Sequence, residues 1–123
     1  MDRIVEIGAF AIAHAEHDGV LVTTVTGDVD HGSVEVIDTE LSARLDRRPA
    51  ALVVDLDGVE FFGSLGITAL LRARRRATRL GVGFAVAVSR RPALRTLQVT
   101  DLVEVLRVRR TLREAVDLAR AAA

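Results

Sequence analysis

Residues 53–81 read VVDLDGVEFFGSLGITALLRARRRATRLG, which passes from an apolar strand pattern through two phenylalanines and a short Gly-Ser loop into a helix. The helical part has an apolar stripe made of Ile67, Leu70, Leu71, Ala77 and Leu80. Its opposite side carries Arg72, Arg75, Arg76 and Arg79. Gly81 is expected to end the helix, because glycine readily takes the left-handed backbone conformation found there. The stretch therefore predicts a strand–loop–helix unit with one buried face.

The segments before this stretch add a hairpin, a helix and the start of the strand. Apolar runs at residues 10–15 and 20–25 flank an Asp-Gly turn and predict antiparallel strands. Residues 33–45 place apolar side chains at steps of three and four, which predicts a helix. Residues 1–8 are treated as an N-terminal extension or strand lead-in, and residues 9–121 as one domain. A continuously apolar Ala-Leu-Val-Val run follows the helix and predicts a strand covered on both faces.

The segments after residue 81 continue the alternation of helices and strands. Residues 82–88 predict a strand, residues 92–99 a short helix with proline near its start, and residues 103–108 a last strand. Residues 111–114 have capping-box spacing and open a terminal helix to about residue 121. Right-handed crossovers connect strands in such patterns. The sequence therefore predicts an α/β fold: a mostly parallel central sheet of about five strands with an antiparallel N-terminal hairpin, covered by about four helices.

Composition excludes several classes of function. The chain has 123 residues, of which 50% are hydrophobic and 28% charged, enough for one ordinary core. Its 17 basic and 17 acidic residues give a net charge of zero, so there is no basic field to attract nucleic acid. No apolar run is long enough to span a bilayer, and the first residues do not resemble a secretion signal. We therefore expect a cytoplasmic domain that neither binds nucleic acid nor inserts into a membrane.

The motifs of common enzymes do not fit. In a nucleophile elbow, G-x-S-x-G, the first glycine is replaced by Phe62, and about eight residues separate Ser64 from the predicted strand end near Asp55. The chain has no lysine, which excludes a P-loop. No base is visibly paired with Ser64. The sequence thus indicates a protein that is not an enzyme and has no cofactor.

Histidines and aspartates give no sign of a metal site. His14, His17 and His31 lack metal-ligand spacing and have no cysteine partners, so all three are predicted to lie on the surface or in turns. Asp28 and Asp30 present two alternatives, a carboxylate pair for chemistry or cation binding, and loop caps. Because aspartates in such turns usually cap backbone groups, the second interpretation is favoured.

Three fragments in order resemble one family. Residues 27–30 (GDVD), 53–56 (VVDL) and 61–67 (FFGSLGI) look like the STAS domain of bacterial anti-sigma factor antagonists. The resemblance covers roughly residues 9–121. It implies a non-enzymatic module that binds an anti-sigma factor, often a serine kinase of the GHKL ATPase type, and so releases a sigma factor.

The family also implies a switch that this sequence lacks at its usual position. Family members commonly have Asp-Ser-Ser-Gly or Asp-Ser-Thr-Gly at this helix start, and phosphorylation of the hydroxyl residue before the glycine turns binding off. Here Gly63 stands in place of the aspartate, Ser64 matches the first hydroxyl position, and Leu65 replaces the phosphate acceptor. Leucine cannot be phosphorylated. The expectation is an antagonist that is not phosphorylated at this position.

The expected partner surface lies at one end of the sheet, where helix N-termini present free backbone N–H groups. It consists of Asp28, Asp30, His31, Phe62, Gly63, Ser64, Leu65, Gly66 and Thr68. Ser64 is interpreted foremost as a helix cap, with a cap that also contacts a partner and a displaced phosphate acceptor as alternatives. Phe61 is predicted to be core, Phe62 core or part of the surface, and Leu65 either inward-packed or exposed.

Other interpretations remain open at the level of sequence. The arginines on the residue 64–80 helix are interpreted as a solvated face, with contact to an acidic patch of a partner as the alternative. STAS-like modules also serve as cytoplasmic accessory subunits of ABC-type transporters. A third interpretation is a sensor that holds a small molecule or nucleotide at the helix N-termini. The sequence is compatible with a monomer or a weak dimer.

Overall fold

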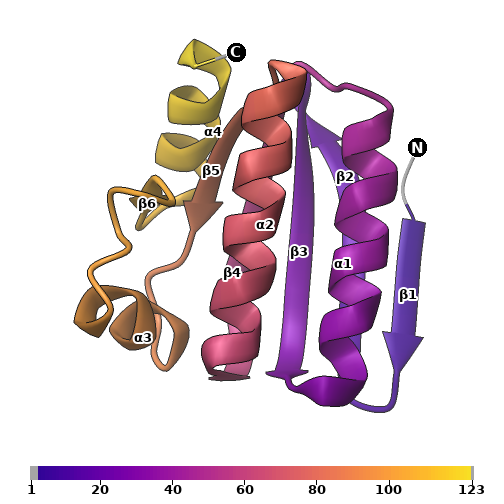
Figure 1. The fold of residues 1–123 in the computed structure, drawn as a ribbon, viewed down its shortest axis with the longest axis vertical. Coiled ribbons are helices and arrows are strands. Elements are labelled where there is room, and N and C mark those ends of the chain that lie inside the picture. Colours follow the sequence, from indigo (N-terminus) through magenta and orange to yellow (C-terminus); the bar gives the residue numbers. More distant parts are fainter. Residues whose placement is uncertain (1–2, 123) are drawn as a thin grey trace.

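The computed structural model describes residues 3–122, which form six strands and four helices (Figure 1). In chain order these are β1 (Arg3–Ile7), β2 (Phe10–His17), β3 (Val20–Val29), α1 (His31–Asp46), β4 (Ala51–Phe62), α2 (Ser64–Leu80), β5 (Gly83–Ala87), α3 (Ala93–Val99), β6 (Val108–Arg109) and α4 (Leu112–Ala121). Within the described residues, no helix is both long and apolar enough to cross a membrane.

The strands lie in the sheet in their order along the chain. The β1–β2 and β2–β3 pairs are antiparallel, and the pairs from β3 to β6 are parallel. This confirms the predicted α/β fold, its N-terminal hairpin and its parallel centre. The sixth strand, β1, comes from the segment that we expected to be an extension or strand lead-in.

Helices cover both faces of the sheet. On one face α1 and α2 run side by side (Figure 1), and the buried Leu45, Leu52 and Leu70 belong to the core beneath them. On the other face α4 buries Ala115 and Ala119 against strand residues of β3, β4 and β5. The predicted ends of two helices are also confirmed. Gly81 closes α2 at φ +72°, and the Thr111 hydroxyl caps α4 by accepting from the Glu114 N–H.

The arginine face of α2 is largely exposed, as predicted, but two of its members bridge to α1. Arg72 pairs with Asp38 at 2.7 Å, and Arg76 pairs with Asp46. Exposed ion pairs of this kind each contribute roughly 0–1 kcal/mol to stability. Arg75, on the same face, is exposed and pairs with no acid of residues 3–122.

The strand β4 is longer than predicted. We expected the strand to end near Asp55, yet β4 continues to Phe62, although aspartate is depleted in strands. The Asp57 carboxylate accepts a hydrogen bond of 2.6 Å from the backbone N–H of Ser89, in the loop after β5. A distant loop thus stabilises a polar residue within the strand. Ser64 follows β4 after one residue, so the turn into α2 is sharp, and the expected eight-residue gap was wrong.

The pairing between β3 and β4 is irregular at two places before the phenylalanine pair. The register shifts between Thr24 and Thr26 and again between Gly27 and Asp28, so β4 contains extra residues relative to β3. Each bulge reverses the inward and outward alternation of a strand, so two bulges restore it, and Phe62 lies on the same face as the buried Leu52, Val54 and Leu56. Phe62 is therefore buried at 4% exposure, whereas Phe61 is 55% exposed. The prediction that Phe61 belongs to the core was wrong, and the core interpretation of Phe62 is confirmed.

The last predicted strand, residues 103–108, is mostly a series of turns. Only Val108 and Arg109 pair with β5. The preceding backbone groups bond locally instead, from Leu106 N–H to Leu102 O at 3.0 Å and from Val108 N–H to Val103 O at 2.8 Å. Apolar content alone predicted a strand here, because it does not distinguish a strand from a packed turn.

The three histidines occupy different environments. His17 and His31 are exposed, as predicted, but His14 is buried at 1% exposure. Its Nδ1 lies 2.8 Å from the Thr23 hydroxyl and its Nε2 lies 3.0 Å from Glu40 Oε1. The surface prediction for His14 was therefore wrong. The strand period of two places residue 14 on the same face as the buried residues 10 and 12, and this signal could have identified it.

The charges in this cluster follow from burial and hydrogen bonding. Burial lowers the pKa of His14 below its usual 6.5, although the hydrogen bond with Glu40 opposes the shift. For Glu40, burial raises the pKa, but hydrogen bonds from Arg3 and His14 outweigh it and lower the pKa overall. A neutral His14 then donates from Nε2 to the Glu40 carboxylate and accepts at Nδ1 from the Thr23 hydroxyl.

Close packing at the start of α2 makes Gly66 and Gly63 respond differently to substitution. A Cβ at Gly66 would lie 2.7 Å from Cδ1 of the buried Phe62 ring, whereas one at Gly63 has no neighbour nearer than 3.7 Å. We expect Gly66→Ala to lower the free energy of unfolding by about 1–3 kcal/mol through overpacking. Gly63→Asp should raise it by about 0.3–1 kcal/mol by adding an N-cap acceptor. Urea denaturation measures both, and equal effects would contradict this packing.

The buried His14 predicts a pH-dependent stability. Because its pKa is lower in the folded than in the unfolded chain, its contribution is complete above pH 6.5 and declines as the pH falls toward the folded-state pKa. We expect the free energy of unfolding to decrease between pH 7 and about pH 5. His14→Gln should flatten this dependence, and His17→Gln, at an exposed site, should retain it. An unchanged slope in His14→Gln would contradict the assignment.

Candidate partner-binding site

Two strand-to-helix junctions lie next to each other at one edge of the sheet. The parallel strands β3 and β4 end in register, with Asp28 opposite Phe61 and Val29 opposite Phe62. In each case one residue separates the strand from the next helix, and these residues, Asp30 and Gly63, are the N-caps of α1 and α2. The topology thus brings together the two sequence fragments that were expected to form one surface.

The β3–α1 junction is held by a capping box. The Asp30 carboxylate accepts from the N–H groups of Gly32 at 3.0 Å and Ser33 at 3.2 Å. The Ser33 hydroxyl in turn accepts from the Asp30 N–H and donates to the Asp28 carbonyl at 2.7 Å. This confirms the cap interpretation for Asp30. Gly27 adopts φ +92°, and a Cβ there would lie 2.6 Å from the Ala9 carbonyl, so the backbone approach requires glycine.

The β4–α2 junction differs from the one expected. Gly63 is the N-cap, without a side chain to accept a hydrogen bond, and Ser64 is the first residue of the helix. Within residues 3–122 no partner hydrogen-bonds to the Ser64 hydroxyl, so the cap role predicted for Ser64 was wrong. Its carbonyl accepts from the hydroxyl of the exposed Thr68 at 3.0 Å. The Thr96 hydroxyl of α3 donates to the Phe62 carbonyl at 3.1 Å and anchors the end of β4.

The predicted surface residues divide into three groups by exposure. Asp28, Asp30, His31, Ser64 and Thr68 are exposed. Gly63 and Leu65 are half-buried, whereas Phe62 and Gly66 are buried and pack against each other. From the sequence, Phe62 was predicted to lie either in the core or on the partner surface. The structure shows that it lies in the core.

Two exposed residues at this edge were missed. Phe61 projects where Phe62 was expected, and Glu60 joins Asp28 and Asp30 around a groove of about 440 Å³. Strand alternation from the buried Leu52, Val54 and Leu56 places residue 61 on the outward face, because the two bulges cancel, so this signal could have found Phe61. Glu60 lies between the fragments 53–56 and 61–67 that resemble the family, so it was not included in the predicted surface.

The groups at this edge of the sheet are suited to contact with another molecule. It offers three carboxylates, an exposed aromatic ring, hydroxyl groups and the N-terminal ends of two helices. Ser64 has no base within hydrogen-bond distance in the part of the chain that the structure describes. No group of three or more His, Cys, Asp or Glu side chains within residues 3–122 is arranged to hold a metal ion.

The sequence has relatives among known regulatory proteins. It is 28% identical over 110 residues to the anti-sigma-F factor antagonist RsfB of Mycobacterium tuberculosis, and the alignment covers 87% of each chain. The fold is similar to the crystal structure of an anti-sigma factor antagonist from Mycobacterium paratuberculosis, with a TM-score of 0.81 and 27% identity. That comparison covers 98% of this chain and 95% of the other.

A second solved structure agrees with the first. The anti-sigma-factor antagonist (STAS) domain protein from Planctomyces limnophilus superposes with a TM-score of 0.73 and 29% identity, over 91% of this chain and 97% of that one. The profile of the STAS domain family matches residues 11–115, a span that runs from β2 into α4 and includes both junctions. This match and the shared fold place the chain in the STAS domain family.

Proposed function

We propose that this protein is an anti-sigma factor antagonist that binds an anti-sigma factor and thereby releases a sigma factor. The observation that carries the proposal is the pair of adjacent βα junctions, which bring exposed residues from both strand ends to the same edge of the sheet. Relatives at 27–29% identity that are named as anti-sigma factor antagonists support it.

The surface favours a partner that is basic with an apolar pocket. Asp28, Asp30 and Glu60 concentrate negative charge around the groove, and like charges on a partner would be repelled there. Next to them Phe61 exposes 55% of its surface on a rigid strand. Aromatic residues with this combination of exposure and rigidity often contribute much of the binding energy of an interface. The partner contact therefore involves Phe61 rather than Phe62.

Control of this contact follows a route other than phosphorylation at residue 65. Leu65 has no hydroxyl, and it is half-buried at the start of α2. Ser64 is exposed and its hydroxyl is not held by another group of residues 3–122, so it remains an alternative acceptor. A phosphate there would add about −1.5 to −2 charges beside the acidic groove and weaken binding of a closely packed partner. Expression level is the other mode of control in this proposal.

Variants at this edge test the binding surface. We expect wild type to capture a small ATPase-type anti-sigma factor from lysate of the source organism, identified by mass spectrometry. Leu65→Glu should abolish capture, and Phe61→Ala should weaken binding of the purified partner by about 30-fold, in the range of an aromatic hot spot. Phe61→Ala should leave stability nearly unchanged, because the ring is exposed.

The matched control is Thr78→Glu, which adds the same charge at an exposed position near the other end of α2. Binding is expected to be retained in this variant. Equal binding of wild type and Leu65→Glu would show that the surface is misplaced. Capture of transporter subunits in place of an anti-sigma factor would show that the function is wrong.

Incubation with the captured kinase and ATP tests the mode of control. Intact-mass measurement is expected to show no stoichiometric phosphate on the loop, or phosphate that Ser64→Ala removes. Thr68→Ala is the matched control, because Thr68 is an exposed hydroxyl residue one turn further along α2. Stoichiometric phosphate on Thr68, or on any residue when Ser64 is replaced by alanine, would contradict the proposed control.

A further inference from the structure

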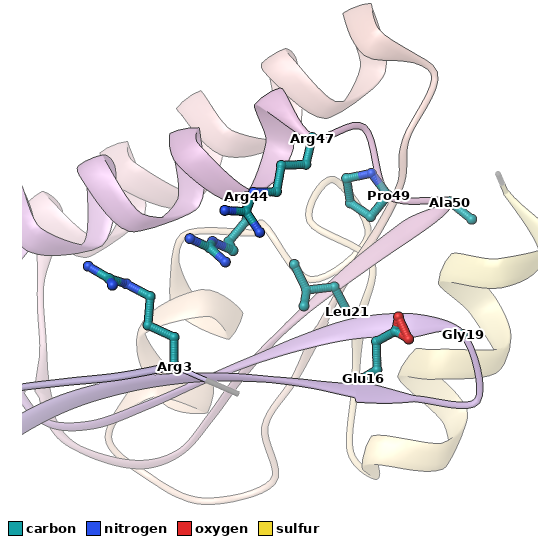
Figure 2. Close-up of a pocket in the computed structure, with 8 residues that line it drawn as sticks. All are labelled: Arg3, Glu16, Gly19, Leu21, Arg44, Arg47, Pro49 and Ala50. Carbon is teal, nitrogen blue, oxygen red and sulfur yellow. The ribbon is translucent and has the colours of Figure 1, made fainter. Parts of the chain in front are cut away.

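A second cavity, of about 480 Å³, opens at the opposite end of the sheet from the two junctions. It lies between the C-terminal part of α1 and the hairpin that joins β2 to β3 (Figure 2). Three arginines line it: Arg3 from β1, Arg44 from the last turn of α1, and Arg47 at the C-cap. Glu16 is the only acid among the described residues that line the cavity, so its walls carry net positive charge.

Two of these arginines have no acidic partner. Within residues 3–122 no carboxylate lies within 4.0 Å of the Arg44 or Arg47 guanidinium group. Arg3 differs, since its Nε donates to Glu40 at 3.1 Å. The Nε of Arg44 is buried and has no hydrogen-bond partner in the described part of the chain. Solvent does not reach this Nε, so the terminal nitrogens of the two guanidinium groups are the donors that an anion in the cavity would contact.

The arrangement of the side chains fits such an anion. In Figure 2 Arg44 and Arg47 extend from α1 into the space above the sheet, and Arg3 rises toward the same space from its strand. Leu21 and Pro49 form an apolar wall beside them. The volume falls within the roughly 300–1,000 Å³ of small-molecule sites, which combine an apolar lining with a few charged groups.

We infer that this cavity is a binding site for a small organic anion with a phosphate or carboxylate group. Arg44 and Arg47 hold the oxyanion through charge-assisted hydrogen bonds, to which planar guanidinium groups are well suited. Leu21 and Pro49 contact the apolar part of the ligand. The site differs from the sensor considered from the sequence, which would hold its ligand at helix N-termini, because these arginines lie at the C-terminal end of α1.

A purely structural role for the two arginines makes a different prediction. Cations in the last turn of a helix stabilise its partial negative charge by about 0.3–1 kcal/mol without any ligand. In that case the arginines would support α1, and no anion would bind with defined stoichiometry. Binding measurements therefore separate the two roles, whereas stability measurements alone would not.

Isothermal titration with two probes, inorganic pyrophosphate and citrate, tests the inference at constant ionic strength. We expect saturable binding at one site per chain for at least one probe, and the probe that binds identifies the oxyanion as phosphate or carboxylate. Arg44→Gln and Arg47→Gln should each weaken it by at least about tenfold, because a hydrogen bond to a charged group is lost. Arg75→Gln is the matched control, at an exposed arginine of α2, and should bind like wild type.

Two results would overturn the inference: no saturable binding of either probe up to about 10 mM, or equal weakening in Arg75→Gln, which indicates diffuse attraction. If Arg44→Gln does not fold, Arg47→Gln decides the outcome, because Arg47 is exposed. Phe61→Ala is expected to bind the anion normally. The anion site is therefore tested independently of the anti-sigma factor surface.

Discussion

The parallel pairing of β3 with β4 is the constraint on which the rest of the structure depends. Because the two strands end in register, the helices that follow them start side by side, and their caps occupy the same edge of the sheet. The pairing also contains two register shifts of one residue each, which together leave Phe62 on the buried face and Phe61 exposed. A single shift in place of two would have reversed the orientation of these rings.

Tight backbone approaches preserve this arrangement. Gly27 passes close to the Ala9 carbonyl before the first junction, and Gly66 lies against the Phe62 ring after the second. Both contacts leave no room for a side chain, so each junction is held by packing as well as by hydrogen bonds. The exposed groups between them are thus presented on rigid backbone, which lowers the entropy lost when a partner binds.

The helix α1 connects two chemically opposite ends of the molecule. The acidic groove of Asp28, Asp30 and Glu60 lies next to the N-terminus of α1. At the C-terminus of α1, Arg44 and Arg47 line the second cavity. Between these two ends of α1, the buried Glu40 of the helix pairs with His14 of β2. With equal numbers of acidic and basic residues, the chain has no net charge, and its charges are separated in space rather than absent.

The sequence by itself determined the elements whose signals are local. The helix from Ser64 to Gly81, the Asp30 cap and the hairpin turn follow from periodicity and backbone preference within a few residues. The motifs also indicated the family and the edge of the sheet that carries the surface. These features were predictable because neighbouring residues specify them without reference to the rest of the chain.

Only the tertiary structure decided the features that depend on distant contacts. Asp57 within β4 accepts a hydrogen bond from the distant Ser89, and two bulges shift the register of β4 against β3. Strand alternation could have indicated that His14 is buried, but only the fold pairs its ring nitrogens with Thr23 on the adjacent strand and with Glu40 of α1. The arginine cavity likewise joins residues from β1, the hairpin and α1. Register and long-range hydrogen bonding have no local signal, so they appear only when the chain is folded.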